Sequence, residues 1–223
     1  MAGAIALTPH QINKVLDKCL LMQDKETKRA AIAISHAGLR VSELARLEIK
    51  DVMYSSGRLR TEVFLPAKIC KGTKPRTVWF SNLKTLKIIQ DLVDYRLKKR
   101  WGTGLKKDQH QYQGLNPETR LLFNNRGRPF AMATKKRVLV DGTIEEYKAC
   151  DTLQIMMQGV YNRCGFKNAS SHTGRKSLAT NAALRGVPLE TIAYLLGHED
   201  PEMTMVYVEI NQKQIERAYG VAI

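Results

Sequence analysis

The sequence predicts a mainly helical fold that carries a small antiparallel β-sheet, an α+β arrangement. Apolar residues recur at helical spacing through much of the chain, for example at Ile12, Leu16 and Cys19. Residues 60–65 and 76–80 are rich in Val, Phe, Thr and Trp and flank a Lys-Gly-Thr-Lys-Pro turn, which predicts a hairpin. Gly and Pro divide the C-terminal part into short segments that are typical of short helices.

The N-terminal part should form three helices. Thr8 and Pro9 have the residue types that favour the N-cap and first turn of the first helix. The second helix is expected over about 25–37, with Gly38 as its end, and the third begins near Ser42.

The middle of the chain alternates between helix and strand. Residues 83–100 form an amphipathic pattern whose final basic residues suit the negative end of a helix dipole. Residues 101–113 are polar and basic and predict a loop, and 121–123 predict a short strand. The Asp141-Gly142 pair favours a second hairpin, although its flanks also permit a helix.

A helix is expected over 149–164, and four short helices should follow it. In the 149–164 helix we expect Ile155, Met156, Val160 and Cys164 to face inward.

Two of the following helices carry candidate functional residues. His172 and Arg175 are three residues apart at a helix start, so their side chains should share one face. Gly197 is placed to end a later helix in the left-handed conformation, which leaves His198 just beyond that end. A tight turn then separates His198 from Tyr207, and we expect both to face one cleft.

Charge narrows the function classes. The 223 residues contain 36 Lys and Arg against 21 Asp and Glu, a net charge of +15. Such an excess favours a polyanionic partner, above all nucleic acid, although solubility or an anionic membrane surface could also explain it.

Cysteine usage and hydropathy point to a reducing, non-membrane setting. Four scattered cysteines form no C-x-x-C pair, and no His stands at a zinc-ligand spacing from any two of them. We therefore expect reduced, mostly buried thiols in a cytoplasmic protein. The sequence has no signal-peptide pattern and no long apolar run, so export and membrane insertion are not expected.

The candidate side chains suit phosphodiester chemistry. Arg40 and Arg175 could grip the non-bridging phosphate oxygens and stabilise the charge that grows in the transition state. Tyr207 could attack phosphorus, but a tyrosine with its ordinary pKa near 10 needs a base or a positive field first. His172 is the candidate base.

Two further groups complete this set. His198 could donate a hydrogen bond to the phosphate, and Lys71, on the predicted hairpin turn, could protonate the departing 5′ oxygen. The sequence shows no cluster of Asp and Glu suited to a two-metal site, so we expect no metal and no other cofactor.

These residues resemble those of the tyrosine recombinase (phage integrase) family, in particular its bacterial Xer and integrase members. The resemblance covers roughly residues 7–219 and rests on five motifs in the family's order. They are Gly38-Leu-Arg40-Val-Ser-Glu43-Leu, Lys71-Gly-Thr-Lys-Pro-Arg, His172-Thr-Gly-Arg175, Leu196-Gly-His198, and Tyr207 nine residues after His198.

The resemblance implies the fold of the family's DNA breaking–rejoining catalytic domain, and site-specific recombination as the activity. It makes Arg40 and Lys71 the catalytic arginine and the general acid, matches His172 and Arg175 to the H-x-x-R box and His198 to the third box, and makes Tyr207 the nucleophile. The reaction would pass through a 3′-phosphotyrosyl intermediate and a Holliday junction without metal or ATP.

The resemblance also implies partners. These are double-stranded DNA with a specific recombination site, four protomers on two such sites, and in some systems a helper protein, with no membrane. The segment 211–219 resembles the C-terminal helix that packs on a neighbouring protomer. The setting would be the bacterial cytoplasm at the nucleoid, for a protein that a phage or mobile element could encode.

One feature departs from the family pattern. We expect residues 1–223 to form a single catalytic domain, and nothing in them corresponds to the helical core-binding domain that usually precedes it. Either the chain is an excised catalytic domain or it is a naturally short recombinase, like those that invert the fimbrial promoter switch.

Several assignments stay open at the level of sequence. Glu43 could act only on the helix start or could buttress Arg40 through a salt bridge, and Tyr194 and Tyr219 are expected to be core or interface aromatics. Basic residues expected to contact the DNA backbone or solvent are Lys74, Arg76, Lys135, Lys136 and Arg137.

Three other functions compete with recombination. A type IB topoisomerase or a hairpin telomere resolvase would share the nucleophile, but their extra domains do not fit in 223 residues. A non-catalytic DNA-binding regulator would not need all six polar groups.

Overall fold

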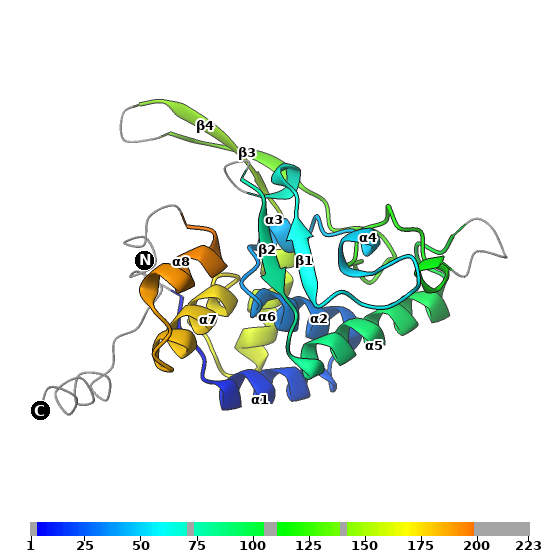
Figure 1. Ribbon diagram of the computed structural model, residues 1–223, viewed down its shortest axis with the longest axis horizontal. Coiled ribbons are helices and arrows are strands. Elements are labelled where there is room, and N and C mark those ends of the chain that lie inside the picture. Colours follow the sequence, from blue (N-terminus) through cyan, green and yellow to red (C-terminus); the bar gives the residue numbers. More distant parts are fainter. Residues whose placement is uncertain (1–3, 71–73, 105–110, 139–141, 199–223) are drawn as a thin grey trace, which may run out of the picture.

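The computed structural model describes residues 4–70, 74–104, 111–138 and 142–198. Its centre is helix α2 (Lys25–Ser35), which packs against α1 (Pro9–Cys19), α5 (Leu83–Lys99) and α6 (Asp151–Arg163) (Figure 1). Every residue from Ala30 to Ile34 is buried, so the second half of this helix is apolar around its whole circumference, whereas its first half carries charged side chains. Neighbours on all sides explain that composition, and the mainly helical expectation is confirmed.

The starts of the helices follow the sequence signals. At α1 the Thr8 side chain accepts from the Gln11 backbone at 3.3 Å, and the Thr8 backbone donates to Gln11 Oε1 at 2.8 Å. This reciprocal pair satisfies donors that the helix start would otherwise leave exposed. Helix α3 (Val41–Leu44) begins one residue before the expected position, and α4 (Ile49–Val52) was not expected.

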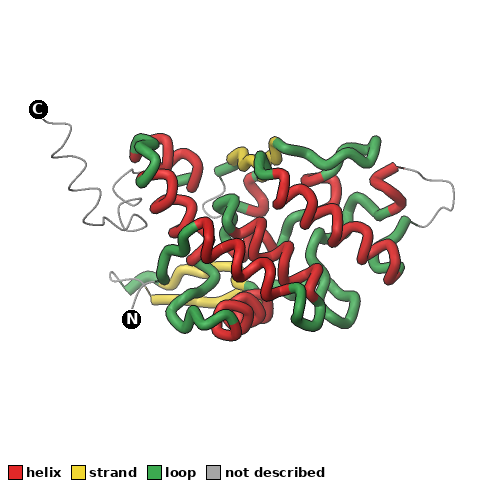
Figure 2. Tube along the Cα trace, turned by 90° about the horizontal axis from the view of Figure 1, so that it is seen from below, coloured by secondary structure: helices red, strands yellow, loops and turns green. Residues whose placement is uncertain are grey.

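Two separate antiparallel strand pairs accompany the helices. Strands β1 (Glu62–Leu65) and β2 (Arg76–Trp79) form the first, and β3 (Ala133–Val138) and β4 (Ile144–Ala149) form the second, which confirms both predicted hairpins. Figure 2 shows the two pairs at different places on the helical body. The β3–β4 pair projects away from that body in Figure 1, and almost all of its side chains are exposed.

The expected strand at 121–123 is wrong. Only Phe123 makes a β-bridge there, to Pro129, and a buried side chain binds carbonyls beside and within the segment. Arg96, near the end of α5, is fully buried and donates to the carbonyls of Trp101, Arg120 and Leu121. The guanidinium therefore satisfies carbonyls that a sheet would otherwise pair.

Helix α6 turns inward largely as expected. Val160 and Cys164 are buried and Met156 is half-buried, so only Ile155 departs from the expectation. Its buried residues are Leu153, Met157, Val160 and Tyr161, whereas Ile155 is 69% exposed. The spacing of four, three and one follows one helical face, and Ile155 lies outside that face.

Helix α7 (Thr173–Ala183) lies directly on the end of α2. A Cβ added to Gly174 would lie 2.5 Å from the Ser35 carbonyl oxygen, closer than a side chain can approach. Helix α8 (Leu189–Leu196) ends at Gly197 with φ 63°, the left-handed end that the sequence predicts. The two further short helices expected after it lie outside the described residues.

The four cysteines are all free and buried, as the sequence predicts. No helix in the described segments has both the length and the apolar character needed to cross a bilayer.

Candidate active site

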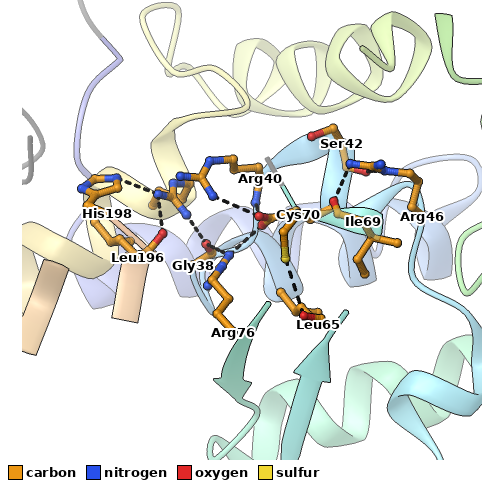
Figure 3. Close-up of polar contacts among 12 residues, drawn as sticks. Gly38, Arg40, Ser42, Arg46, Leu65, Ile69, Cys70, Arg76, Leu196 and His198 are labelled. Atoms are coloured by element: carbon orange, nitrogen blue, oxygen red, sulfur yellow. Dashed lines mark hydrogen bonds and ion pairs between the residues drawn. The ribbon is translucent and has the colours of Figure 1, made fainter. Parts of the chain in front are cut away.

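Arg40 is presented at the junction between α2 and α3. Gly38 adopts φ +91°, which an L side chain rarely allows, and turns the chain after α2. Arg40 then stands in extended conformation just before α3. Its backbone donates to Glu43 Oε2 at 2.7 Å, and its Nη1 donates to Glu43 Oε1 at 3.0 Å (Figure 3).

Glu43 both caps the start of α3 and forms a salt bridge with Arg40. The two roles that the sequence left as alternatives therefore both occur. The carboxylate is fully buried and also accepts from Arg76 Nη2 at 2.6 Å. Burial alone would raise the pKa of Glu43, but the charges of Arg76 and Arg40 outweigh burial and hold that pKa below its usual value. The carboxylate therefore remains charged between two guanidinium groups.

Arg175 is the most enclosed of the predicted site residues. It lies on α7 with 1% of its surface exposed. Its Nη1 donates to the Gly38 carbonyl at 2.6 Å, and its Nη2 donates to the Leu196 carbonyl at 2.9 Å. Arg175 thus joins the turn after α2 to the end of α8, two segments that are distant in sequence.

His198 completes this network just beyond the end of α8. Its Nε2 lies 2.8 Å from Arg175 Nη2. Burial, followed by the charges of Arg175 and Arg40, lowers the pKa of His198 to about 4. Because a guanidinium only donates, Nε2 must accept, and the neutral ring carries its proton on Nδ1. That nitrogen can donate a hydrogen bond.

His172 is placed differently from its predicted partner. It is the N-cap of α7 and is exposed, one helical turn before buried Arg175. The structure therefore brings Arg40, Arg175 and His198 into one network and leaves His172 at the surface beside it. Lys71 and Tyr207 lie outside the described residues.

The segment that leads to Lys71 is fixed to α3. Arg46 donates to the carbonyls of Ser42, Lys68 and Ile69, and Cys70 Sγ lies 3.6 Å from the Leu65 carbonyl oxygen (Figure 3). This anchoring sets where the β1–β2 turn begins relative to Arg40.

Arg76 requires a correction. The sequence suggested a contact with DNA backbone or solvent, but the side chain is only 9% exposed and its guanidinium binds protein groups. A signal for this was present, because Arg76 stands two residues before buried Val78 and alternate residues of a strand share a face.

The other basic candidates are at the surface. Lys74 is exposed just before β2. Each basic residue of β3 has an acidic partner: Lys135 pairs with Asp151 at 2.7 Å, Lys136 with Glu146 at 3.1 Å, and Arg137 with Glu145 at 2.7 Å.

For Tyr194 the structure excludes one of the two expected places, and a place in an interface stays a prediction. The Tyr194 side chain is 67% exposed on α8 and is therefore not part of the core of this chain. Among the residues described, no three His, Cys, Asp or Glu side chains gather as metal ligands would.

The fold and sequence place the chain in a known family. The sequence pattern of the phage integrase family matches residues 6–214, and the chain belongs to this family. It is 27% identical over 186 residues to the tyrosine recombinase XerC of Pelobacter propionicus, covering 83% of this chain and 48% of that protein. It is also 27% identical over 213 residues to the tyrosine recombinase XerA of Pyrococcus horikoshii, covering 96% and 59%.

Solved structures agree on the fold. A crystal structure of XerA recombinase superimposes with a TM-score of 0.68 at 19% identity, over 99% of this chain and 65% of that one. XerH recombinase bound to its difH substrate after cleavage gives 0.65 at 18% identity, over 97% and 52%. The chain therefore spans about half to two thirds of the length of these relatives. The expected fold class is confirmed.

Proposed function

We propose that this chain is the catalytic part of a site-specific DNA recombinase that cleaves and rejoins DNA through Tyr207. The observation that carries the proposal is a network in which Arg175 contacts the His198 ring, and Arg76 links Arg175 to Arg40 through the Gly38 carbonyl and Glu43. Such a set of donors suits a phosphodiester whose negative charge grows in the transition state.

The steps follow from the donors and the expected nucleophile. Arg40 and Arg175 bind the non-bridging oxygens, and His198 donates from Nδ1. The Tyr207 oxygen forms a bond to phosphorus while the bond to the 5′ oxygen breaks, which leaves a 3′-phosphotyrosyl link and a 5′-hydroxyl. Since one phosphodiester replaces another, the chemistry needs neither ATP nor an external nucleophile.

Two further groups would handle protons. His172, exposed at the start of α7, would accept the tyrosine proton, and Lys71 would donate a proton to the departing 5′ oxygen. In the second half of the cycle the 5′-hydroxyl of a partner duplex attacks the phosphotyrosine, and two such exchanges pass through a Holliday junction.

The proposed partner is double-stranded DNA with a specific site. Lys74 and the exposed basic residues of β3, which are Lys135, Lys136 and Arg137, would contact its phosphates. Four protomers would assemble on two sites at the bacterial nucleoid, with residues 211–219 packing on a neighbour and a helper protein in some settings. Surface cations position a protein on DNA without selecting its sequence.

A suicide substrate tests the proposal. DNA with a nick beside the scissile phosphate loses the short 5′-hydroxyl strand after attack, so the covalent protein–DNA adduct accumulates. The wild-type chain should form this adduct in the presence of a metal chelator, Tyr207→Phe should not, and Tyr194→Phe, which changes an exposed tyrosine of α8, should.

Three outcomes would contradict the proposal. An adduct that persists in Tyr207→Phe would remove Tyr207 from its role, and loss of cleavage on chelation would overturn the mechanism. Relaxation of supercoiled plasmid without a target site would favour a topoisomerase instead.

A further inference from the structure

We propose that Arg76 is a positioning residue for DNA cleavage. It acts on Arg40 through Glu43, and on His198 through the end of α8. The inference rests on the proposed function and extends it to a residue that does not touch the substrate.

Three hydrogen bonds hold the Arg76 side chain. Its Nη2 donates to Glu43 Oε2 at 2.6 Å and to the Gly38 carbonyl at 3.1 Å, and its Nη1 donates to the Leu195 carbonyl at 3.0 Å. These acceptors belong to α3, to the turn before it and to α8. One guanidinium from β2 therefore ties together three segments that carry site residues.

Arg76 also shares its acceptors with the proposed catalytic arginines. The other carboxylate oxygen of Glu43 accepts from Arg40, and the Gly38 carbonyl also accepts from Arg175 at 2.6 Å. Without Arg76 the Glu43 carboxylate would lose a charge-assisted partner and would interact more strongly with Arg40. The position and availability of the Arg40 guanidinium thus depend on Arg76.

Arg76 also lies against the end of α8. A Cβ on Gly197 would lie 2.5 Å from Arg76 Cδ, so the Gly197 backbone rests on the aliphatic part of the arginine. His198 is the next residue, and its ring is held by Arg175. Arg76 therefore supports the backbone from which His198 extends.

The environment of Arg76 favours a positioning role over direct contact with DNA. The side chain is 9% exposed, and three protein acceptors already use its two terminal nitrogens. To reach a phosphate it would have to give up its ion pair with Glu43, and a fully buried carboxylate that loses a charged partner is costly.

The test compares cleavage with binding in the full chain. We would measure the rate of adduct formation on the nicked substrate at saturating DNA, and separately the Kd for intact DNA at several salt concentrations. For Arg76→Met we expect the saturated rate to fall about 10- to 100-fold, because small displacements of phosphate-binding groups have effects of this size. We expect the Kd and its salt dependence to be unchanged.

Two variants accompany it. Arg58→Met is the matched control, since Arg58 is an exposed arginine stacked over the Tyr54 ring at 5.0 Å, and we expect the wild-type rate. Arg76→Lys keeps the charge but has a single ammonium in place of the fork, so its rate should fall between those of Arg76→Met and wild type. If Arg76→Met loses its cooperative thermal transition, Arg76→Lys carries the test.

The outcomes are distinct. A wild-type rate in both Arg76 variants would overturn the inference while leaving the proposed function intact. So would an unchanged saturated rate together with a salt slope smaller by about one, which is the behaviour of a phosphate contact. Absence of an adduct with the wild-type chain would instead reject the proposed function.

Discussion

At the scale of single residues, Glu43 has the strongest influence on the site. Its buried carboxylate accepts from the backbone and side chain of Arg40 and from Arg76. The donors of Arg40 and Arg76 stabilise the buried charge of Glu43. Removing one of these three side chains leaves the others without a partner for their charge. The site geometry and the stability of the fold therefore depend on the same carboxylate.

We expect Glu43→Gln to lower the free energy of unfolding by about 3 kcal/mol, because two partly buried guanidinium groups lose their counter-charge. Urea denaturation at neutral pH measures this. Glu118→Gln removes an exposed partner of Lys50 and should change stability very little, because water screens such a surface pair. Equal effects of the two substitutions would contradict the role given to Glu43.

His36 predicts a pH dependence of stability. Burial lowers its pKa to about 4 from the usual 6.5, and its Nδ1 donates to the Ile32 carbonyl at 2.9 Å. Between these two pH values the unfolded chain binds a proton that the folded chain excludes. Stability is therefore highest above pH 6.5 and falls as the pH decreases towards 4.

His36→Gln should reduce that fall by up to about 1.4 kcal/mol per pH unit, while His198 continues to contribute in the same range. The measurement is the free energy of unfolding from pH 7 to pH 4. His10→Gln, at an exposed position in α1, is the matched control substitution. An unaltered slope in His36→Gln would show that His36 is protonated in the fold.

At the scale of elements, local signals predicted the helices and hairpins well because caps, turns and strand patterns depend on nearby residues. The left-handed end at Gly197 is an example. Long-range contacts were not predictable in this way. Arg76 and Arg96 both look like surface cations in sequence, yet each satisfies carbonyls from segments that only the folded chain brings near.

The sequence predicted those residues of the candidate site that belong to recognisable motifs. The resemblance identified Arg40, Arg175 and His198, which the structure joins, but no motif shows that Arg76 connects them. The tautomer of His198 also required the structure, because it depends on which nitrogen faces Arg175.

The long-range contacts of Arg96 can be tested through the stability of the fold. We expect Arg96→Met to lower the free energy of unfolding by about 3 kcal/mol, because one buried and two partly buried carbonyls lose their donor. Lys98→Met on the exposed side of α5 should have little effect. Thermal or urea unfolding checks this, and similar stabilities for the two variants would contradict it.

At the scale of the whole molecule, the net charge of +15 favours attraction of DNA, and the exposed β3–β4 pair offers a surface that could contact it. The β3 cations are paired with acids of the same hairpin or of α6, so a phosphate would have to replace a carboxylate. Binding should therefore respond to the acidic residues as well as to the basic ones.

If the hairpin meets DNA, Lys136→Ala should weaken binding and Glu146→Gln should strengthen it, since the second change leaves Lys136 without its ion pair. Titrations of duplex DNA at several salt concentrations measure both, and Lys136→Ala should reduce the salt slope by about one. Unchanged affinity in both variants would place the hairpin away from DNA.

In the proposed mechanism, the cations of the site act on the charge of one phosphate. The most direct measurement is adduct formation by Arg40→Ala on two nicked substrates, one normal and one with a neutral methylphosphonate at the scissile position. On the normal substrate we predict a rate loss of about 10²- to 10³-fold relative to wild type. On the neutral substrate most of that loss should disappear, and an equal loss on both substrates would contradict the claim.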